Sequence, residues 1–370
     1  MKRKLNKKNI IILSIIVLLI VIEIINPIKL YNKHVLKQLN YSDTSINTIL
    51  KYGKKDQVLN SKNNKVLDKI FNSKDYKDKN FNIYLELNDS NITNFVSLTN
   101  SLIDKGYNAK EINGILKNSN EEDVLEFLKL DYQEGIDNYL QFDFFKLSNY
   151  QEYIAYKKEN NIDYEDIVIN VNIGLNKDYY EDANTVSDFS TTMLVNKYNG
   201  LDKDFVPSDL VSVDKEYAID SKQKANREMY EAFIKMSDDC KKETGYKVIF
   251  RSGYRDYKSQ EDTYNLYLKT YGKKYAEVYA AHAGFSEHQT GLAVDIKAES
   301  SNTFAGTKES NWLSKNAHKY GFILRYKKET EDITGYKYES WHYRYVGSIA
   351  EKVYESNMTY DEYYIRFLDK

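Results

Sequence analysis

The strongest hydrophobic signal lies near the start of the chain. Residues 10–25 read IIILSIIVLLIVIEII, and five basic side chains within residues 2–8 directly precede them. A basic end followed by a long apolar segment predicts a membrane helix whose basic end stays in the cytoplasm. At about 1.5 Å per residue, residues 10–25 are shorter than a bilayer core of about 30 Å. We therefore place the membrane-spanning helix at residues 9–30, after a cytoplasmic tail of residues 1–8.

The alternative interpretation of this segment is a cleaved signal peptide, whose apolar region can have a similar length. The residues after Ile25 read NPIKLYNK, which offers no pair of small residues for cleavage and no Cys for lipidation. We therefore expect an uncleaved signal anchor. It predicts a single-pass protein of the cell membrane, with everything after residue 30 outside the cell.

Residues 31–150 contain an imperfect repeat of short amphipathic segments. Residues 41–51 (YSDTSINTILK) resemble residues 107–117 (YNAKEINGILK), 66 positions later, and each copy is followed by a second short apolar unit. Apolar residues at i, i+3 and i+4 predict short helices, which begin near Ser42 or Asp43 and near Asn108. This region is interpreted as a helical stalk. It could form a recognition module, but we favour a spacer that packs on itself.

The pattern then becomes extended over residues 151–190, which we interpret as a linker. Residues 166–173 (DIVINVNI) alternate and are β-branched, which predicts a strand that ends at Gly174. Residues 192–195 are a second candidate strand. The catalytic domain is placed at residues 191–370.

Within that domain the pattern predicts a helix, a strand and a second helix. One apolar face recurs every three or four residues and ends at Gly245; it consists of Ala225, Met229, Phe233, Met236 and Cys240. Residues 248–250 predict a buried strand, and the next helix ends at Gly272.

Composition narrows the possible chemistry. Cys240 is the single cysteine, which excludes a disulfide framework and any cysteine-rich metal site, and its place on an apolar stripe predicts a small core residue. A net charge of −2 argues against nucleic acid as a partner. A transition-metal site in this chain would therefore use His and carboxylate ligands, and there are only five His residues.

Four of these His residues fall within residues 250–347, and two of them have notable surroundings. His288 precedes Asp295 by seven residues, and Asp295 interrupts an apolar run in which a carboxylate needs a partner. His342 follows Glu339 by three residues. Two imidazoles and one carboxylate can bind zinc and leave a fourth position open for water.

Hydrolysis at such a site needs two further groups. A separate carboxylate must accept the proton of the attacking water, and Glu339 suits that role. A positive charge must stabilise the developing oxyanion, and either Arg255 or Arg251 could supply it.

Four blocks of sequence make a resemblance specific. They read SGYR (252–255), SEHQTGLAVDI (286–296), the WL…NA…YGFILRY stretch (312–326) and YESWHYRYVG (338–347). Together they resemble the VanY-type D-alanyl-D-alanine carboxypeptidases, a group of zinc peptidases that act on bacterial wall peptides. The resemblance covers roughly residues 190–350, and residues 194–211 resemble the segment with which the family's domain begins.

The resemblance implies a role for each matching residue. His288, Asp295 and His342 correspond to the family's Zn²⁺ ligands, and Glu339 corresponds to its base. Arg255 is implied to hold the substrate carbonyl or terminal carboxylate, and Gln260 and Ser286 are implied to contact substrate. The implied fold is α+β, a small antiparallel sheet with flanking helices, as in zinc D,D-peptidases and hedgehog-like domains.

One departure from the family pattern concerns the loop before SEH. The chain reads His282-Ala283-Gly284-Phe285, where relatives usually carry Pro before the Gly. The change affects loop stiffness and substrate fit but no implied metal ligand. We interpret His282 as a loop residue, His318 as structural and His34 as a surface residue.

These observations predict a membrane-anchored zinc carboxypeptidase that removes the terminal D-alanine from peptidoglycan stem peptides. Two alternatives remain. One is a related specificity, such as L,D-carboxypeptidase activity on tetrapeptide stems or cleavage elsewhere in the stem. The other is a non-catalytic wall-binding scaffold, against which the presence of all three ligands and Glu339 argues.

Overall fold

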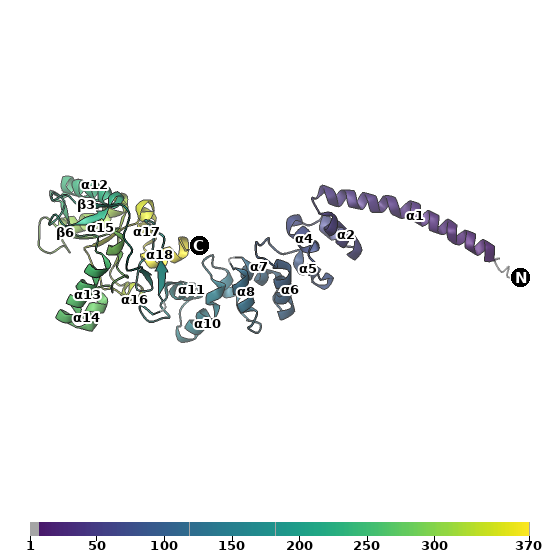
Figure 1. Ribbon diagram of the computed structural model, residues 1–370, viewed down its shortest axis with the longest axis horizontal. Helices are drawn as coiled ribbons and strands as arrows, with labels where there is room; N and C mark the ends of the chain where they lie inside the picture. Colours follow the sequence, from purple (N-terminus) through teal and green to yellow (C-terminus); the bar gives the residue numbers. More distant parts are fainter. Residues whose placement is uncertain (1–6, 118, 182, 370) are drawn as a thin grey trace. The chain divides into compact units, whose positions relative to one another are not determined.

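The chain divides into two compact units, residues 1–150 and 151–370. The computed structural model describes the backbone of residues 7–117, 119–181 and 183–369, and the side chains of these residues except those of 7–10 and 16–26. In the described part, the first unit is helical and every strand belongs to the second unit (Figure 1).

The chain begins with α1 (Lys7–Gln38), a helix of 32 residues. The predicted membrane span at residues 9–30 falls partly on residues whose side chains lie outside the described part of the chain. Among the residues that the structure does describe, no helix has the length and apolar character that a membrane crossing requires.

The remainder of the first unit consists of short helices. They are α2 (Asp43–Tyr52), α3 (Lys55–Leu59), α4 (Asn64–Phe71), the 3₁₀ turn η1 (Asp78–Asn80), α5 (Phe81–Tyr84), α6 (Phe95–Lys105), α7 (Ala109–Leu116), α8 (Glu121–Phe127), α9 (Asp137–Leu140) and η2 (Leu147–Asn149).

The helices predicted for the two repeat copies are confirmed as α2 and α7. The Ser42 side chain accepts from the backbone N–H of Ser45, and Asn108 forms a capping box with Glu111. These side chains satisfy backbone donors that have no partner within the helix. The second apolar unit of each copy also forms a helix, α3 and α8.

The second unit combines helices with three small sheets. Its helices are α10 (Tyr150–Glu159), α11 (Tyr164–Ile173), α12 (Arg227–Thr244), α13 (Tyr257–Tyr271), α14 (Lys273–Tyr279), α15 (Lys308–Asn316), α16 (Glu331–Thr334), α17 (Ala350–Ser356) and α18 (Tyr360–Phe367), with 3₁₀ turns η3 (Glu287–Thr290), η4 (Ala317–Tyr320) and η5 (Gly347–Ile349). Two sheets are strand pairs: β1 (Asn184–Val186) with β2 (Asn199–Leu201), parallel, and β3 (Leu210–Ser212) with β4 (Lys224–Asn226), antiparallel.

The third sheet is the centre of the second unit. Its four strands are β5 (Val248–Ser252), β6 (Ala293–Ala298), β7 (Phe322–Leu324) and β8 (His342–Tyr345), in the order β5-β6-β8-β7 with every pairing antiparallel. The predicted small antiparallel sheet with flanking helices is thus confirmed.

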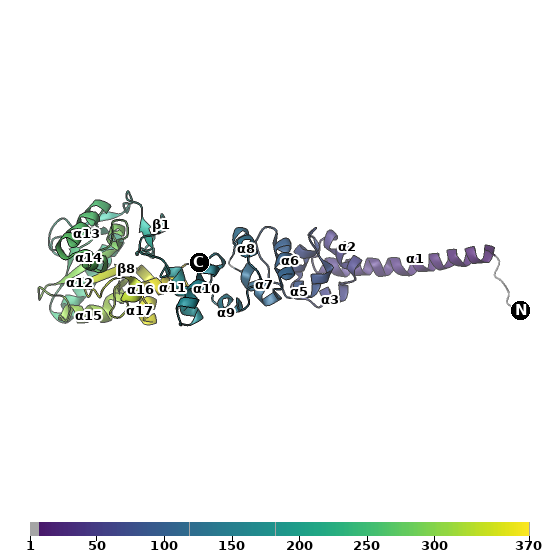
Figure 2. The ribbon, with the colours of Figure 1, turned by 90° about the horizontal axis from the view of Figure 1, so that it is seen from below.

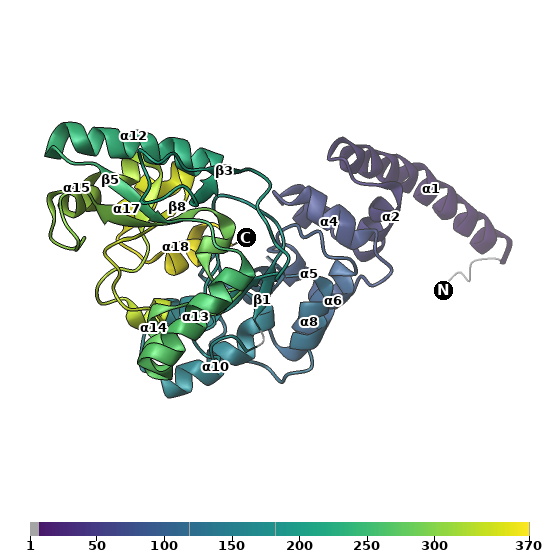
Figure 3. The same cartoon turned by 60° about the vertical axis from the view of Figure 1, so that its left-hand side comes forward.

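The apolar core covers one face of this sheet. Val294 and Ile296 of β6 and Tyr343 of β8 join the core formed with α12, including the predicted stripe from Ala225 to Cys240. The long helix predicted here is confirmed, and Cys240 is fully buried as a core residue. Figure 3 shows α12 along one side of the sheet and α13 on the other, and Figure 2 shows α13 and α14 lying together.

The strand predicted over residues 166–173 is wrong, because this segment is helix α11. Its apolar side chains are buried around most of the helix, so the alternation does not mark one exposed face. Gly174 ends it with a φ of 107° and donates to the carbonyls of Asn170 and Val171, as in many helix ends. Tertiary burial outweighs the strand preference of β-branched residues here. With α10 and α11 present, the extended linker predicted for residues 151–190 is corrected as well.

The strand predicted at residues 192–195 is also wrong. The segment is buried but has no strand partner. Its carbonyl groups instead accept from side chains: Arg344 donates to Met193 O and Tyr360 donates to Thr192 O.

Candidate active site

Two central strands place Asp295 and His342 opposite each other. In the antiparallel pairing of β6 and β8, Asp295 is the direct partner of His342. Successive side chains of a strand point to opposite faces. Because Val294, Ile296 and Tyr343 enter the core with α12, Asp295 and His342 project from the other face.

His288 reaches the same point from a 3₁₀ turn before β6. The turn η3 begins after Ser286, whose hydroxyl accepts from the backbone N–H of His288 at 3.3 Å. Gly291 then adopts a φ of 71° and turns the chain into the strand that carries Asp295. The seven-residue spacing between His288 and Asp295 is therefore a tight turn of the chain at Gly291.

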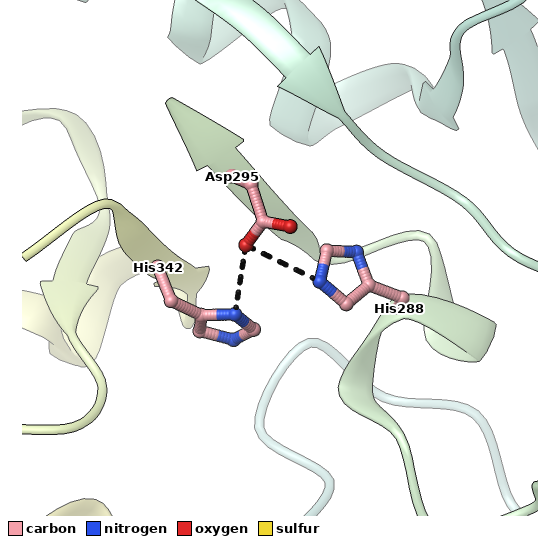
Figure 4. Close-up of side chains that lie close together, drawn as sticks. All are labelled: His288, Asp295 and His342. Carbon is pink, nitrogen blue, oxygen red and sulfur yellow. Dashed lines mark hydrogen bonds and ion pairs between the residues drawn. The ribbon is translucent and has the colours of Figure 1, made fainter. Parts of the chain in front are cut away.

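The three side chains aim their donor atoms at one point. Asp295 Oδ1 lies 3.2 Å from His342 Nδ1 and 3.4 Å from His288 Nε2, as drawn in Figure 4. All three donor atoms lie within 4.8 Å of one another. Ligand atoms at 2.0–2.1 Å from a tetrahedral Zn²⁺ are separated by about 3.3 Å. The two separations from Asp295 Oδ1, 3.2 and 3.4 Å, therefore fit zinc.

The far nitrogen of each ring has an acceptor that sets its tautomer. His288 Nδ1 lies 2.7 Å from the carbonyl oxygen of Gly253, and His342 Nε2 lies 3.2 Å from Glu287 Oε2. A carbonyl and a carboxylate accept, so these nitrogens carry the protons. The lone pair of His288 Nε2 is then directed at the shared point, as is that of His342 Nδ1 once this nitrogen has lost its proton, which metal ligation requires.

Burial and neighbouring charges set the protonation of the three residues. Burial and the Arg255 cation lower the pKa of His288 to about 4. Burial alone would lower the pKa of His342, but the bonds to Asp295 and Glu287 raise it to about 9. Burial opposes ionisation of Asp295, but the two imidazoles hold its pKa well below the usual range.

Glu339 stands beside this group in a cavity of about 450 Å³. Its carboxylate Oε2 is 3.8 Å from His342 Nδ1, and it comes from the loop that leads into β8. Burial raises the pKa of Glu339 to about 8. A buried carboxylate with a raised pKa next to an open cavity is suited to take up and release a proton.

Arg255 provides a positive charge at the wall of the same cavity. Its Nη1 is 3.7 Å from Asp295 Oδ2 and donates to Ser252 Oγ at 2.9 Å, while its Nε donates to Gln260 Oε1 at 2.9 Å. Gln260 is 1% exposed, and its amide nitrogen donates to Ala281 O. In this structure Gln260 therefore fixes the Arg255 guanidinium, although it also lines the cavity.

The structure places the other candidate residues as follows. Ser286 lines the cavity, and Arg251 lies at its wall with an exposed side chain. His282 stacks on Tyr180, His318 stacks on Tyr354, and His34 contacts Gln38. None of these three His residues joins the metal-binding group found among the described residues.

The sequence analysis missed a buried ionic network behind His342. Glu287 Oε1 accepts from Arg325 at 2.8 Å and from Arg344 at 3.1 Å, and Arg325 also donates to Asp361 at 2.6 Å. These four side chains are at most 2% exposed. A signal was present in HYRY (342–345), because Arg344 lies on the same strand face as His342, and a buried Arg needs a carboxylate partner.

Comparison with known proteins agrees with this geometry. Residues 222–348 match the family model described as VanY: D-alanyl-D-alanine carboxypeptidase. YodJ of Bacillus subtilis (strain 168), which is named as a carboxypeptidase, is 40% identical over 211 residues, which cover 53% of this chain and 77% of YodJ.

The chain belongs to the VanY family. Members of this family are zinc metallopeptidases, and the donor set described above fits that metal, so the cofactor is Zn²⁺. A D-alanyl-D-alanine carboxypeptidase of Enterococcus faecium is 34% identical over 179 residues, which cover 46% of this chain and 56% of the relative.

Solved structures of similar proteins include one described as an LD-carboxypeptidase and one described as a D,D-pentapeptidase. The LD-carboxypeptidase LdcB shares 37% identity, with 50% of this chain and 91% of LdcB covered and a TM-score of 0.46. The D,D-pentapeptidase VanY of a VanB-type resistance cassette, solved with Zn(II), shares 30% identity over 47% of this chain and 98% of that one, with a TM-score of 0.42.

Proposed function

We propose that this protein is a membrane-anchored carboxypeptidase that removes the C-terminal D-alanine from peptidoglycan stem peptides outside the cell membrane. The observation that carries the proposal is the group of three donor atoms beside the buried Glu339, in a cavity large enough for the end of a peptide. The family relatives named as D-alanyl-D-alanine carboxypeptidases support the substrate class.

The residues of the cavity have distinct roles in this proposal. His288, Asp295 and His342 would hold Zn²⁺, which when bound polarises a carbonyl group and makes water more acidic. Glu339 takes the proton of the attacking water and delivers it to the amine nitrogen of the departing D-alanine. Arg255, held by Gln260 and Ser252, presents its cation to the terminal carboxylate or the developing oxyanion.

The position of Glu339 gives the first test of the mechanism. Glu339→Gln keeps the size of the side chain but cannot accept a proton. We expect this variant to bind zinc as the wild type does and to lose turnover by at least about 10²-fold, the low end of a general base's contribution. Zinc content and D-alanine release are measured on the same preparation. Wild-type turnover by the variant would refute the role of Glu339.

The stereochemical specificity is tested directly on substrate. The proposal predicts that pentapeptide stems lose one D-alanine, whereas tetrapeptide stems stay intact; mass spectrometry of muropeptides distinguishes the two. The second candidate is an L,D-carboxypeptidase, because similar proteins include LdcB. Cleavage of the tetrapeptide alone would replace the D,D assignment and leave the zinc chemistry in place.

Membrane anchoring is part of the proposal and rests on the sequence. The basic residues before position 9 and the apolar residues 10–25 support an anchor with the remainder outside. The test is protease treatment of spheroplasts that carry a C-terminal tag on the full chain. External protease should remove the tag, and a tag protected until the membrane is lysed would refute the external orientation.

A further inference from the structure

Glu287 is a carboxylate in the interior of the second unit, next to the metal-binding group. It is 2% exposed, and its two carboxylate oxygens have different hydrogen-bond partners. Oε1 accepts from Arg325 and Arg344, whereas Oε2 faces His342 Nε2 at 3.2 Å. The two guanidiniums therefore lie against one oxygen of this buried carboxylate and supply it with positive partners.

This geometry restricts the His342 ring. The Glu287 carboxylate accepts from its Nε2–H, so Nδ1 is the nitrogen that faces the point shared with Asp295 and His288 and can give its lone pair to a metal there. Without an acceptor behind it, the ring could carry its proton on Nδ1 or rotate about its side-chain bonds. Either change would direct an N–H at the metal position in place of a lone pair.

The network continues to the C-terminal helix, outside the residues that match the family model. Arg325 Nη1 donates to Asp361 Oδ2 of α18 at 2.6 Å, and Asp361 Oδ1 accepts from Asn196 at 2.8 Å. Arg344 also donates to Met193 O at 2.8 Å. Helix α18 thus contacts the Arg325 guanidinium, and the segment before β2 contacts the Arg344 guanidinium. Both guanidiniums in turn donate to Glu287.

The charges of this cluster balance only when all four members are present. Glu287 and Asp361 supply two negative charges, and Arg325 and Arg344 supply two positive charges, and each of these residues is at most 2% exposed. Removal of one carboxylate leaves an uncompensated buried cation near His342, which is costly in a low-dielectric interior. Such a cation would also repel a metal cation at the adjacent position.

We propose that Glu287 is a positioning residue for zinc: it fixes the tautomer and orientation of His342, and Asp361, acting through Arg325, maintains the charge balance that this requires. The inference rests on the proposed zinc site. It assigns to α18 a part in metal affinity, although α18 contributes no ligand and lies about 20 residues beyond His342 in sequence.

The experiment measures the zinc dissociation constant of the full chain by competition with a chelator. Glu287→Gln keeps the shape of the side chain and removes its charge, and we expect zinc affinity to fall about 10- to 100-fold. Asp361→Asn leaves the ligands and Glu287 in place, and a loss of roughly threefold or more is expected. In the Co²⁺-substituted protein, the visible absorption bands of Glu287→Gln should shift because the ligand field of His342 changes.

A matched control separates positioning from general destabilisation. Glu309 is also fully buried, and its carboxylate accepts from the backbone and hydroxyl of Ser300, away from the metal-binding group. Glu309→Gln should lower the melting temperature and leave zinc affinity and the Co²⁺ spectrum unchanged.

The outcomes are decisive in each case. If wild-type protein binds no zinc, the proposed function and this inference both fail. If the wild type binds zinc and both network variants fold and bind it within threefold of wild type, only this inference fails. If Glu287→Gln does not fold, the zinc affinity of Asp361→Asn alone tests this inference.

Discussion

At the scale of single residues, His342 and Glu339 hold protons that leave when zinc binds. The pKa of His342 is raised to about 9 by its bonds to Asp295 and Glu287, and burial raises the pKa of Glu339 to about 8. Both groups are therefore protonated at pH 7 without metal, whereas His288, with a pKa of about 4, is neutral. Ligation needs the Nδ1 lone pair of His342, and a cation beside Glu339 favours its ionised form.

We therefore predict that zinc binding at pH 7 releases about two protons from the wild-type protein and about one from Glu339→Gln. The measurement is titration of the metal-free protein with ZnCl₂ in a pH-stat. Both proteins release the proton of His342, so the difference in proton release between them is the contribution of Glu339. Equal proton release from the two proteins would show that Glu339 does not change its protonation when zinc binds.

The contacts of Gln260 give a second prediction at this scale. Its Oε1 accepts from Arg255 Nε at 2.9 Å, and a hydrogen bond to a charged group contributes about 1.5–3 kcal/mol. Gln260→Ala should therefore lower kcat/KM for stem peptides about tenfold or more, with zinc affinity unchanged. Gln260→Glu keeps an acceptor for Arg255 and should retain more activity than Gln260→Ala. The reverse order would mean that the amide itself binds substrate.

At the scale of elements, the loop after β5 links the sheet to the metal-binding group. Gly253 O accepts from His288 Nδ1, and the Gly253 backbone runs so close to Lys224 O and the Phe250 ring that a Cβ would collide with both. The SGYR block thus needs a glycine here for close approach of the backbone. Movement of this loop would remove the acceptor that sets the His288 tautomer.

Gly253→Ala is therefore expected to reduce zinc affinity by about tenfold or more in addition to lowering stability. Gly245→Ala is the matched control. Gly245 ends α12 with a φ of 89° and a Cβ there would meet no neighbour within 4 Å, so this change costs about 1 kcal/mol of backbone strain. Its zinc affinity should equal that of the wild type. Unchanged zinc binding by Gly253→Ala would show that the loop does not position His288.

At the scale of the whole molecule, the second unit begins at Gln151, before the predicted start of the catalytic domain at residue 191. Helix α11 packs against α18, and Arg366 forms an ion pair with Glu165 at 2.6 Å. Residues 164–173 therefore support the helix that carries Asp361.

We predict that residues 151–370 expressed alone unfold in one cooperative transition and retain hydrolysis of soluble muropeptides. A fragment of residues 191–370 should be less stable by about 5 kcal/mol or more, since each fully buried aliphatic side chain of α11 contributes roughly 1.5–3 kcal/mol. Urea unfolding of both fragments checks this. Equal stability would mean that α10 and α11 are not part of the folding unit.

The sequence by itself determined the local features of this protein. Capping residues and apolar periodicity located α2, α7 and α12, because these signals act within a few residues along the chain. The types and order of His288, Asp295, Glu339 and His342, together with the resemblance to the family motifs, predicted a zinc site, and the structure brings the donor atoms of the two His residues and Asp295 together. The same motifs selected His288 and His342 as candidate zinc ligands from the five His residues of the chain.

Only the tertiary structure decided what depends on contacts distant in sequence. Residues 166–173 form a helix because their surroundings bury nearly all of its faces, which alternation cannot reveal. Gln260 is occupied by Arg255 and Ala281, and Glu287 is tied to Arg325, Arg344 and, through Arg325, Asp361. A linear pattern names the residues that can ionise or donate, but the partner that fixes each buried charge is set by the fold, because burial without that partner would cost too much free energy.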